Sequence, residues 1–195
     1  MKNKLLNTYI ITTLLVLLDA LAYYTKKISL IGYYSDAILF WIWLALSLTV
    51  IIVYWKKIFA KILLSGFLLA LIVSILPMML PFYTMLLSMS SMGLKISKDL
   101  NKNFRAQIVG YSVLGHPWLE IIEKRGLLEK RIIICLDNEI NDENTDFRLG
   151  ATKDIIFNQE TDKMLSLTLF YGGPNRLITF DKTTGRIIKA QNLRH

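Results

Sequence analysis

The sequence predicts a membrane protein in which about three transmembrane α-helices precede a small, mostly β soluble domain. Residues 1–94 hold only nine charged side chains, seven Lys and two Asp, whereas residues 95–195 hold twenty-nine. The 195-residue chain is 53% hydrophobic, more than an average soluble domain, and the excess falls in the first half. We therefore expect a helical membrane region over residues 1–94 and a soluble region over residues 95–195.

Three apolar segments are long enough to cross a bilayer. The expected spans are residues 5–24, 37–55 and 59–80. At about 1.5 Å per residue, a helix of about twenty residues matches the roughly 30 Å of bilayer hydrocarbon. Tyr and Trp flank the first two spans, as is typical of rings anchored at the membrane interface. Pro77 and Pro81 interrupt the third apolar run, so residues 82–93 are expected to form a short helix at the interface.

The N-terminus also fits a second interpretation. Lys2 and Lys4, an apolar stretch and then Ala20-Leu21-Ala22 have the pattern of a signal peptide that is cleaved near residue 22. The apolar stretch is long for such a signal, and an acidic residue precedes the candidate cleavage site. We therefore favour an uncleaved helix.

The charge pattern leaves open which side of the membrane holds the C-terminal domain. A cytoplasmic N-terminus would place five Lys inside, and the reverse orientation would place six basic residues inside. Three spans from a cytoplasmic start, or a cleaved signal peptide, would put the domain outside the cytoplasm. The basic segment 95–105 would instead suit the anionic inner leaflet. We favour the extracytoplasmic side for a multi-pass protein of the cell membrane.

The second half of the chain is typical of short strands separated by turns. Strands are expected at residues 106–114, 130–136, 153–158, 164–171, 176–182 and 186–190. Glycine-containing turns separate the last three strands, which predicts a small sheet, sandwich or barrel. The segment 117–125 fits a helix that begins at Pro117, which would make the domain α+β, or a hairpin that turns at Arg125-Gly126. We favour the hairpin.

Few side chains suggest chemistry. Asp19 is the only carboxylate inside an expected span and could carry a proton or bind a cation, although a paired or interfacial acid is the simpler interpretation. His116 lies in a Gly-His-Pro turn without a nucleophile at a recognisable spacing. Cys135 is the single cysteine, so an intrachain disulfide is excluded, and its apolar neighbours predict a buried thiol. The acidic segment from Asp137 lacks the Gly and Glu of a calcium-binding EF-hand loop.

Methionines gather around the end of the third span. Thioethers are ligands for Cu(I), but methionine also fills apolar gaps, and neither His nor Cys accompanies these residues. The four that fall near one helical face are Met78, Met85, Met89 and Met92. Packing is the favoured role, and no metal site, cofactor or catalytic residue is predicted.

The function expected from this sequence is that of a non-enzymatic, membrane-anchored module that binds a protein or lipid partner. The nucleotide-binding and hydrolase motifs with known spacing are missing, which disfavours an enzyme. One alternative is an oligomeric pore-forming protein or membrane effector in which residues 82–93 gate a channel. Another is an immunity or inhibitor protein acting at the membrane. Besides the lipid bilayer, a protein partner or self-association is open. Nucleic acid is not expected, since the basic stripe in the second half is short.

Overall fold

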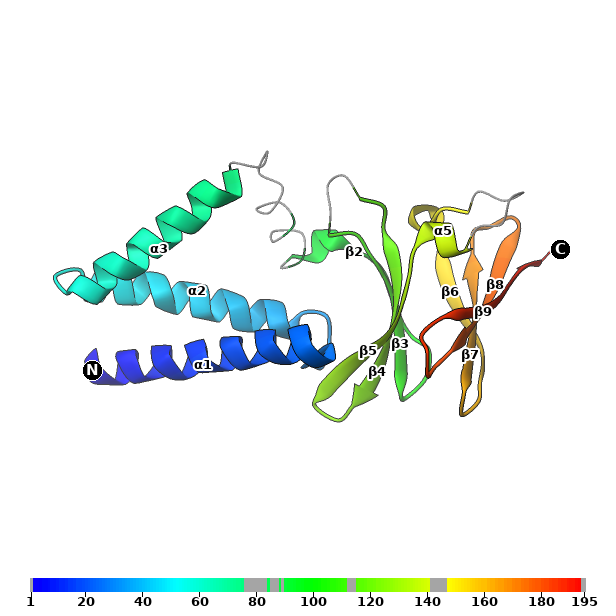
Figure 1. The fold of residues 1–195 in the computed structure, drawn as a ribbon, viewed down its shortest axis with the longest axis horizontal. Helices are drawn as coiled ribbons and strands as arrows, with labels where there is room; N and C mark the ends of the chain where they lie inside the picture. The colour runs from blue at the N-terminus through cyan, green and yellow to red at the C-terminus, as the bar shows by residue number, and fades with distance from the viewer. Residues whose placement is uncertain are drawn as a thin grey trace. The chain divides into compact units, whose positions relative to one another are not determined.

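The computed structural model describes residues 2–75, 84, 88, 90–111, 115–140 and 147–193. It divides into two compact units, Met1–Ser91 and Met92–His195. The first unit holds three apolar helices and the second holds two antiparallel sheets (Figure 1). The expected succession of apolar helices and a β-rich part is thus confirmed.

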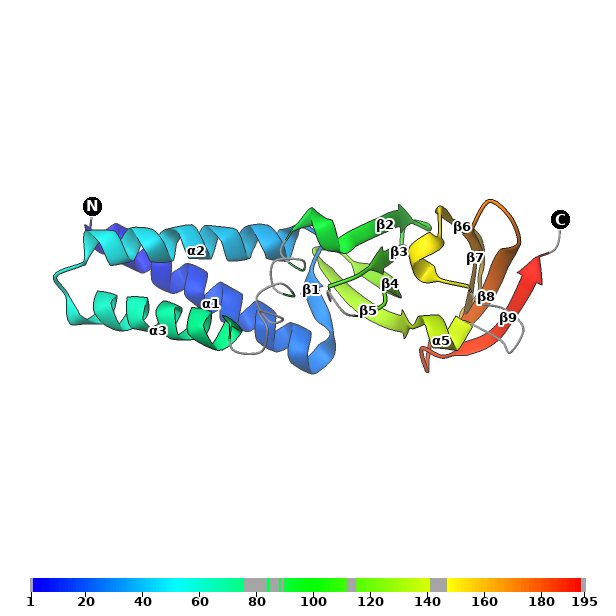
Figure 2. The same cartoon turned by 90° about the horizontal axis from the view of Figure 1, so that it is seen from above.

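The helical unit consists of α1 (Lys2–Lys26), α2 (Ser35–Val53) and α3 (Ile58–Ile75), and successive helices run in opposite directions (Figure 2). Helix α2 packs against both of the others. The indole N–H of Trp43 in α2 donates to Thr13 Oγ1 in α1 at 3.1 Å, and the Trp43 ring lies 5.8 Å from the Phe67 ring of α3. This single tryptophan therefore contacts both neighbouring helices.

Two of these helices are long and apolar enough to cross a membrane. They are Asn3–Lys26 and Ser35–Val53, and the first, being N-terminal, would also qualify as a signal sequence. The comparable part of α3, Ile58–Val73, is shorter. The predicted break at Pro77 and half of the segment 82–93 lie outside the described residues. Within that segment, Ser91–Gly93 forms a single 3-10 turn, η1.

The α1–α2 connection is short and ordered by hydrogen bonds. It contains the strand β1 (Ile28–Leu30). Lys27 has a φ of +56°, which turns the chain at the end of α1. The backbone N–H of Leu30 donates to Asp36 Oδ1 at 3.1 Å, so a carboxylate of the first turn of α2 holds the strand.

The first sheet of the β unit contains β2 (Leu94–Asp99), β3 (Phe104–Val109), β4 (Trp118–Arg125) and β5 (Leu128–Cys135), in the order β5-β4-β3-β2. The segment 117–125 is thus a strand, and the favoured hairpin is confirmed. Its loop is Gly126-Leu127, because Arg125 pairs with Leu128. Gly126 has a φ of +67°. A glycine with positive φ at the first loop position is the type II′ pattern, which matches the twist of the two strands.

Strand β2 is not among the predicted strands, because Lys95 and Lys98 also fit a basic membrane-proximal segment. The strand nevertheless alternates half-buried and exposed residues from Leu94 to Asp99, with a period of two. It pairs with β3 through the whole of its length apart from one irregularity near Leu94. The segment 95–105 is therefore part of the sheet.

The second sheet is a meander of β6 (Asp154–Glu160), β7 (Met164–Phe170), β8 (Asn175–Asp181) and β9 (Ile187–Leu193). A short helix, α5 (Asp137–Ile140), and a 3-10 turn, η2 (Leu149–Ala151), lie between the two sheets in sequence. Leu165, Leu167 and Leu169 of β7 are fully buried, as their period-two spacing predicts.

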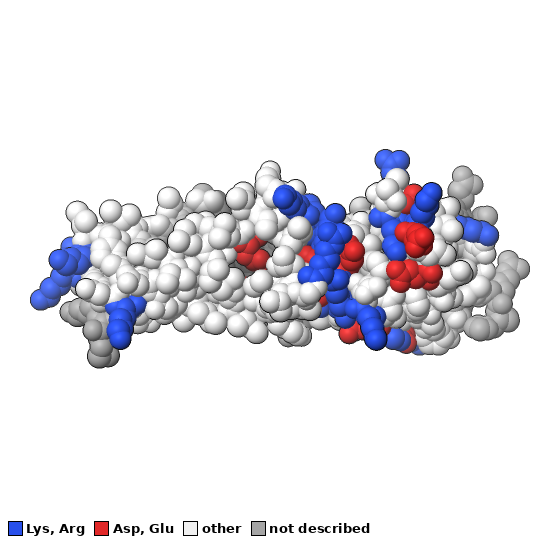
Figure 3. Space-filling view, turned by 90° about the horizontal axis from the view of Figure 1, so that it is seen from below, with Lys and Arg blue, Asp and Glu red and all other residues white. Residues whose placement is uncertain are grey.

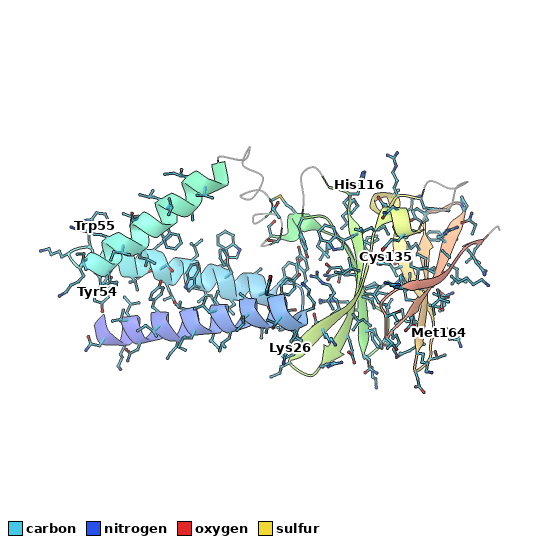
Figure 4. All side chains as sticks on the ribbon, in the orientation of Figure 1. Lys26, Tyr54, Trp55, His116, Cys135 and Met164 are labelled. Atoms are coloured by element: carbon cyan, nitrogen blue, oxygen red, sulfur yellow. The ribbon has the colours of Figure 1, made fainter. Side chains whose placement is uncertain are left out.

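A single apolar core joins the two sheets into a sandwich. Strands β3, β4 and β5 contribute Ile108, Leu119 and Ile133, and the second sheet contributes leucines of β7 and Phe180 of β8. Cys135 belongs to this core and is labelled in Figure 4. Its predicted burial is confirmed, and that burial raises the pKa of its thiol.

Candidate binding site in the β unit

The candidates proposed from the sequence lie on separate elements. Asp19 lies on α1 among the less exposed positions that recur every three or four residues, and it has no hydrogen bond or ion pair within the described residues. Met92 is exposed in the η1 turn. The side chain of His116 is exposed, and its Nδ1 lies 3.8 Å from Asp137 Oδ2 (Figure 4). The methionines at positions 78, 85 and 89 lie outside the described residues.

The sandwich carries a polar cleft that no sequence pattern predicted. Its volume of about 590 Å³ falls within the range of small-molecule sites. Three turns border it, namely those between β2 and β3, between β6 and β7, and between β8 and β9. The residues that line it are Asn103, Phe104, Glu123, Lys124, Ile132, Glu160, Asp162, Lys182 and Thr183.

Glu160 fastens the walls of this cleft to each other. Asn101 Nδ2, from the β2–β3 turn, donates to Glu160 Oε2 at 2.6 Å. Lys182 Nζ donates to Glu160 Oε1 at 2.9 Å and to the carbonyl oxygen of Thr161 at 3.0 Å, and it lies 4.9 Å from the centre of the Phe104 ring. Both carboxylate oxygens are thus held, so the cleft is formed before any ligand arrives.

Gly185 shapes the turn between β8 and β9, which carries Lys182 and Thr183 of the cleft. Its φ is +71°, and a Cβ at this position would lie 2.8 Å from the carbonyl oxygen of Ile132 in β5. Asp181 Oδ1 accepts hydrogen bonds from the backbone N–H groups of Thr183 at 2.7 Å and Thr184 at 3.3 Å. These bonds lower the pKa of the Asp181 carboxyl. The turn therefore lies close against β5 and has a fixed shape.

Most charges of the cleft are neutralised by neighbours. Lys124 Nζ lies 2.7 Å from Asp99 Oδ1, and Glu123 Oε2 lies 2.7 Å from a guanidinium nitrogen of Arg125. Asp162 has no ion-pair or hydrogen-bond partner within the described residues. The groups left for a ligand are thus the carboxylate of Asp162 and the side-chain amide of Asn103, because the hydroxyl of Thr183 is hydrogen-bonded to Asp181. Because most charges of the cleft are paired, we expect a ligand to be recognised through hydrogen bonds to these groups and not through a strong electrostatic attraction.

The chemistry of the cleft follows from the groups that line it. Its lining contains neither a Ser or Cys beside a base nor a His. Among the described residues, no group of three His, Cys, Asp or Glu side chains is placed to hold a metal ion. The carboxylate, amide and ammonium groups of the lining are suited to binding a polar molecule.

A second, more apolar hollow of about 400 Å³ lies beside the turn between β7 and β8. The rings of Phe147 and Tyr171 line it at a centroid distance of 4.9 Å, together with Gly172 and Pro174. Burial raises the pKa of the Tyr171 hydroxyl. Phe147 directly follows residues 141–146, which lie outside the described residues.

The first sheet also carries a buried charged layer on the face turned away from the core. Arg105 Nη2 donates to Glu129 Oε2 at 2.6 Å across β4. Glu120 is fully buried, and its oxygens accept hydrogen bonds from Gln107 at 2.8 Å and Trp118 at 2.7 Å. The sequence carries a signal for this layer, since polar residues alternate with Ile along the β4–β5 hairpin, but that alternation is also typical of a solvated face.

The charges of the two units differ in their distribution. In the view of Figure 3, both signs mingle over the β unit, whereas the helical unit shows a long uncharged stretch with basic side chains at the end where α1 begins. No protein-family model, curated protein or solved structure matches the chain.

Proposed function

We propose that this chain is a membrane-anchored binding module, in which the helical unit lies in a bilayer and the cleft of the β unit takes up a polar ligand. The observation that carries the membrane part is the inverted burial pattern of the helical unit. Large aliphatic side chains are exposed there, with Ile52 at 76% and Ile58 at 78%. Most of the buried residues of this unit are small, namely Thr12, Ala37, Ser47 and Ala60, and Val50 and Ile51 are buried beside them.

This pattern fits lipid better than water. A soluble helical hairpin buries its large aliphatic residues, and an extended apolar surface on a soluble monomer is rare. Helices in a bilayer gain nothing from burying such residues, so they pack through small side chains and interhelical hydrogen bonds. The bond from Trp43 to Thr13 is of that kind. Asp19 is the one charged residue between Lys4 and Lys26, and Asp36 is the one charged residue of α2.

The binding part of the proposal is supported by the cleft itself. The β unit has its own core, and hydrogen bonds from Asn101 and Lys182 to Glu160 hold the cleft open between its two sheets. A preformed site avoids the entropic cost of ordering on binding. The pore-forming and immunity alternatives gain no specific support from the described residues.

Membrane anchoring is tested by washing membranes that contain the full chain with alkaline carbonate. We expect the chain to stay in the pellet at its full mass of 22.5 kDa. Release into the supernatant would refute anchoring. A stable product that lacks the first 22 residues would instead support the signal-peptide interpretation.

Ligand binding is tested on the detergent-solubilised full chain with a library of amines, amino acids and monosaccharides at millimolar concentration. We expect at least one of these classes to raise the thermal unfolding midpoint of the wild type. The gain should disappear in Asp162→Asn and in Asn103→Ala, and it should persist in Lys189→Gln, which alters an exposed residue of β9 outside the cleft. Binding that survives both cleft variants would reject the cleft as the site and leave anchoring unaffected.

A further inference from the structure

We propose that one end of the helical unit is a binding surface for the headgroups of anionic phospholipids. We call this surface the lysine end, and it consists of Lys4, Lys56, Lys57 and Lys61. The inference rests on the proposed membrane anchoring and adds the identity of the lipid partner. It follows from three observations, namely the convergence of the lysines, their distance from carboxylates of the same helices, and the aromatic residues beside them.

Helix pairing brings these lysines to the same end. The hydrogen bond from Trp43 to Thr13 fixes the register of the antiparallel helices α1 and α2. Lys4 lies nine residues before Thr13, so it is level with about residue 52 of α2, one turn before the loop that contains Lys56 and Lys57. Lys61 follows in the first turn of α3. Figure 3 shows the basic side chains at this end.

The loop that carries two of the lysines has a defined shape. The backbone N–H of Tyr54 donates to the carbonyl oxygen of Val50 at 2.9 Å, and that of Lys57 donates to the carbonyl oxygen of Tyr54 at 2.7 Å. The backbone N–H of Ala60 donates to the carbonyl oxygen of Lys57 at 3.2 Å and so joins the loop to α3. The lysine end is therefore presented on an ordered turn between two helices.

The four lysines are exposed, and none forms an ion pair with a carboxylate of the described residues. The two acids on the same helices are remote. Asp19 is fifteen residues from Lys4, about 22 Å along α1, and Asp36 is twenty residues from Lys56, about 30 Å along α2. Both distances exceed the Debye length at physiological salt, about 8 Å. By contrast, several lysines of the β unit are paired with acids, as Lys98 is with Asp154.

Aromatic rings accompany these cations. Trp55 is 53% exposed, and the ring of Tyr54 lies 5.4 Å from that of Phe59 in α3. Both Tyr54 and Trp55 lie at this end of the unit in Figure 4. Trp and Tyr settle at the level of the lipid headgroups, and lysines beside them reach the phosphate groups. This combination favours a lipid headgroup over a free anion, since a free anion would gain nothing from the rings.

The test measures lipid binding to the purified full chain by native mass spectrometry, with phosphatidylglycerol and phosphatidylcholine as probes. We expect phosphatidylglycerol to bind more tightly, and the Lys56→Gln/Lys57→Gln variant to lose on the order of tenfold in that affinity. The matched control is Lys26→Gln/Lys27→Gln, which removes two lysines from the far end of α1 and should change the affinity little. Raising the salt concentration should weaken the phosphatidylglycerol complex of the wild type.

The outcomes separate this inference from the proposed function. Membranes that contain each variant are first washed with carbonate. Release of the chain into the supernatant would contradict the proposed membrane anchoring. A chain that stays in the membrane but binds both lipids equally, or loses affinity equally in the two double variants, would overturn the lysine end alone. Competition by millimolar inorganic phosphate would show a general anion site and would also overturn the assignment to lipid.

Discussion

At the scale of single residues, Gly185 makes the sharpest prediction. Its positive φ and the 2.8 Å approach of an added Cβ to the Ile132 carbonyl oxygen both oppose a side chain. We expect Gly185→Ala to lower the free energy of unfolding of the β unit by about 1–3 kcal/mol. Pulse proteolysis of the full chain across a urea series measures this loss. The control is Gly173→Ala, because an added Cβ there meets nothing within 4 Å, and equal losses in both variants would contradict the argument.

Asp154 makes a prediction about pH. Its carboxylate accepts two hydrogen bonds from Lys98 Nζ, at 2.8 and 2.7 Å, and these lower its pKa below the ordinary value of 3.8. A depressed pKa in the folded state stabilises the fold above pH 3.8, and this contribution is lost as the pH falls through the folded pKa. The pair is partly exposed, so solvent screening limits its contribution to about 1 kcal/mol or less.

The measurement compares the wild type with Asp154→Asn by pulse proteolysis between pH 3 and pH 7. We expect the wild type to be slightly more stable near neutral pH and the two proteins to converge in acid. High salt should reduce the difference at neutral pH. A difference that grows on acidification would have the wrong sign and would refute the role given to this pair.

At the scale of elements, the ion pair between Arg105 and Glu129 spans β4 and links β3 to β5. Both side chains are nearly buried, so removing one partner leaves an uncompensated charge. We expect Arg105→Met to destabilise the β unit by about 3–5 kcal/mol, and the double variant Arg105→Met/Glu129→Met to recover most of this loss. The matched control is Arg125→Met, whose pair with Glu123 is more exposed and should contribute less than about 1 kcal/mol. A double variant no more stable than the single one would count against an uncompensated charge as the cause.

The strands of the β unit show which elements could be predicted from the sequence and which could not. Period-two spacing correctly predicted β7, and the favoured interpretation of residues 117–125, a hairpin that turns at Arg125-Gly126, is confirmed over a helix. Strand β2 has the same period but was missed, because its lysines also fit a membrane-proximal segment. The ion pair of Lys98 with Asp154, which engages this lysine within the β unit, joins residues 56 positions apart. A contact between residues so far apart in the sequence cannot be recognised from the pattern of neighbouring residues.

The cleft could not be predicted from the sequence either, because it is formed by residues that are distant along the chain. Asn101, Glu160 and Lys182 come from turns that are distant in sequence, and they meet only because the two sheets pack on one core. Each turn by itself is typical of a solvated hairpin. By contrast, Cys135 could be predicted as buried, since its environment is set by apolar residues of its own strand.

At the scale of the whole molecule, the two units place their polar groups according to different rules. The helical unit keeps most of its charges at its ends, and the β unit pairs charges of opposite sign over its surface and beneath it. The ion pairs of the β unit change the count of basic residues that could determine which side of the membrane holds this unit. Once the β unit is folded, Lys98 and Arg105 are engaged with acids, so the six basic residues counted on that side fall to four, against five lysines on the side of the lysine end.

We therefore expect the lysine end to face the cytoplasm, where anionic lipids concentrate, and three crossings would then place the β unit outside. The test introduces Lys189→Cys in β9 and, separately, Lys57→Cys in the α2–α3 loop, and applies a membrane-impermeant maleimide to spheroplasts. The native Cys135 should stay unlabelled in both proteins, because its thiol is buried and its pKa is raised. Labelling at position 189 in intact spheroplasts, and at position 57 only after lysis, is the expected result.

Other labelling patterns have distinct meanings. Position 57 labelled before lysis and position 189 only after it would place the β unit in the cytoplasm and reverse the proposed orientation. Both positions on the same side would mean that α3 and the residues after it do not cross the bilayer, so that α1 and α2 alone anchor the chain. Either result would also decide where a ligand of the cleft must be sought, because a polar molecule can reach Asp162 only from the compartment that holds the β unit.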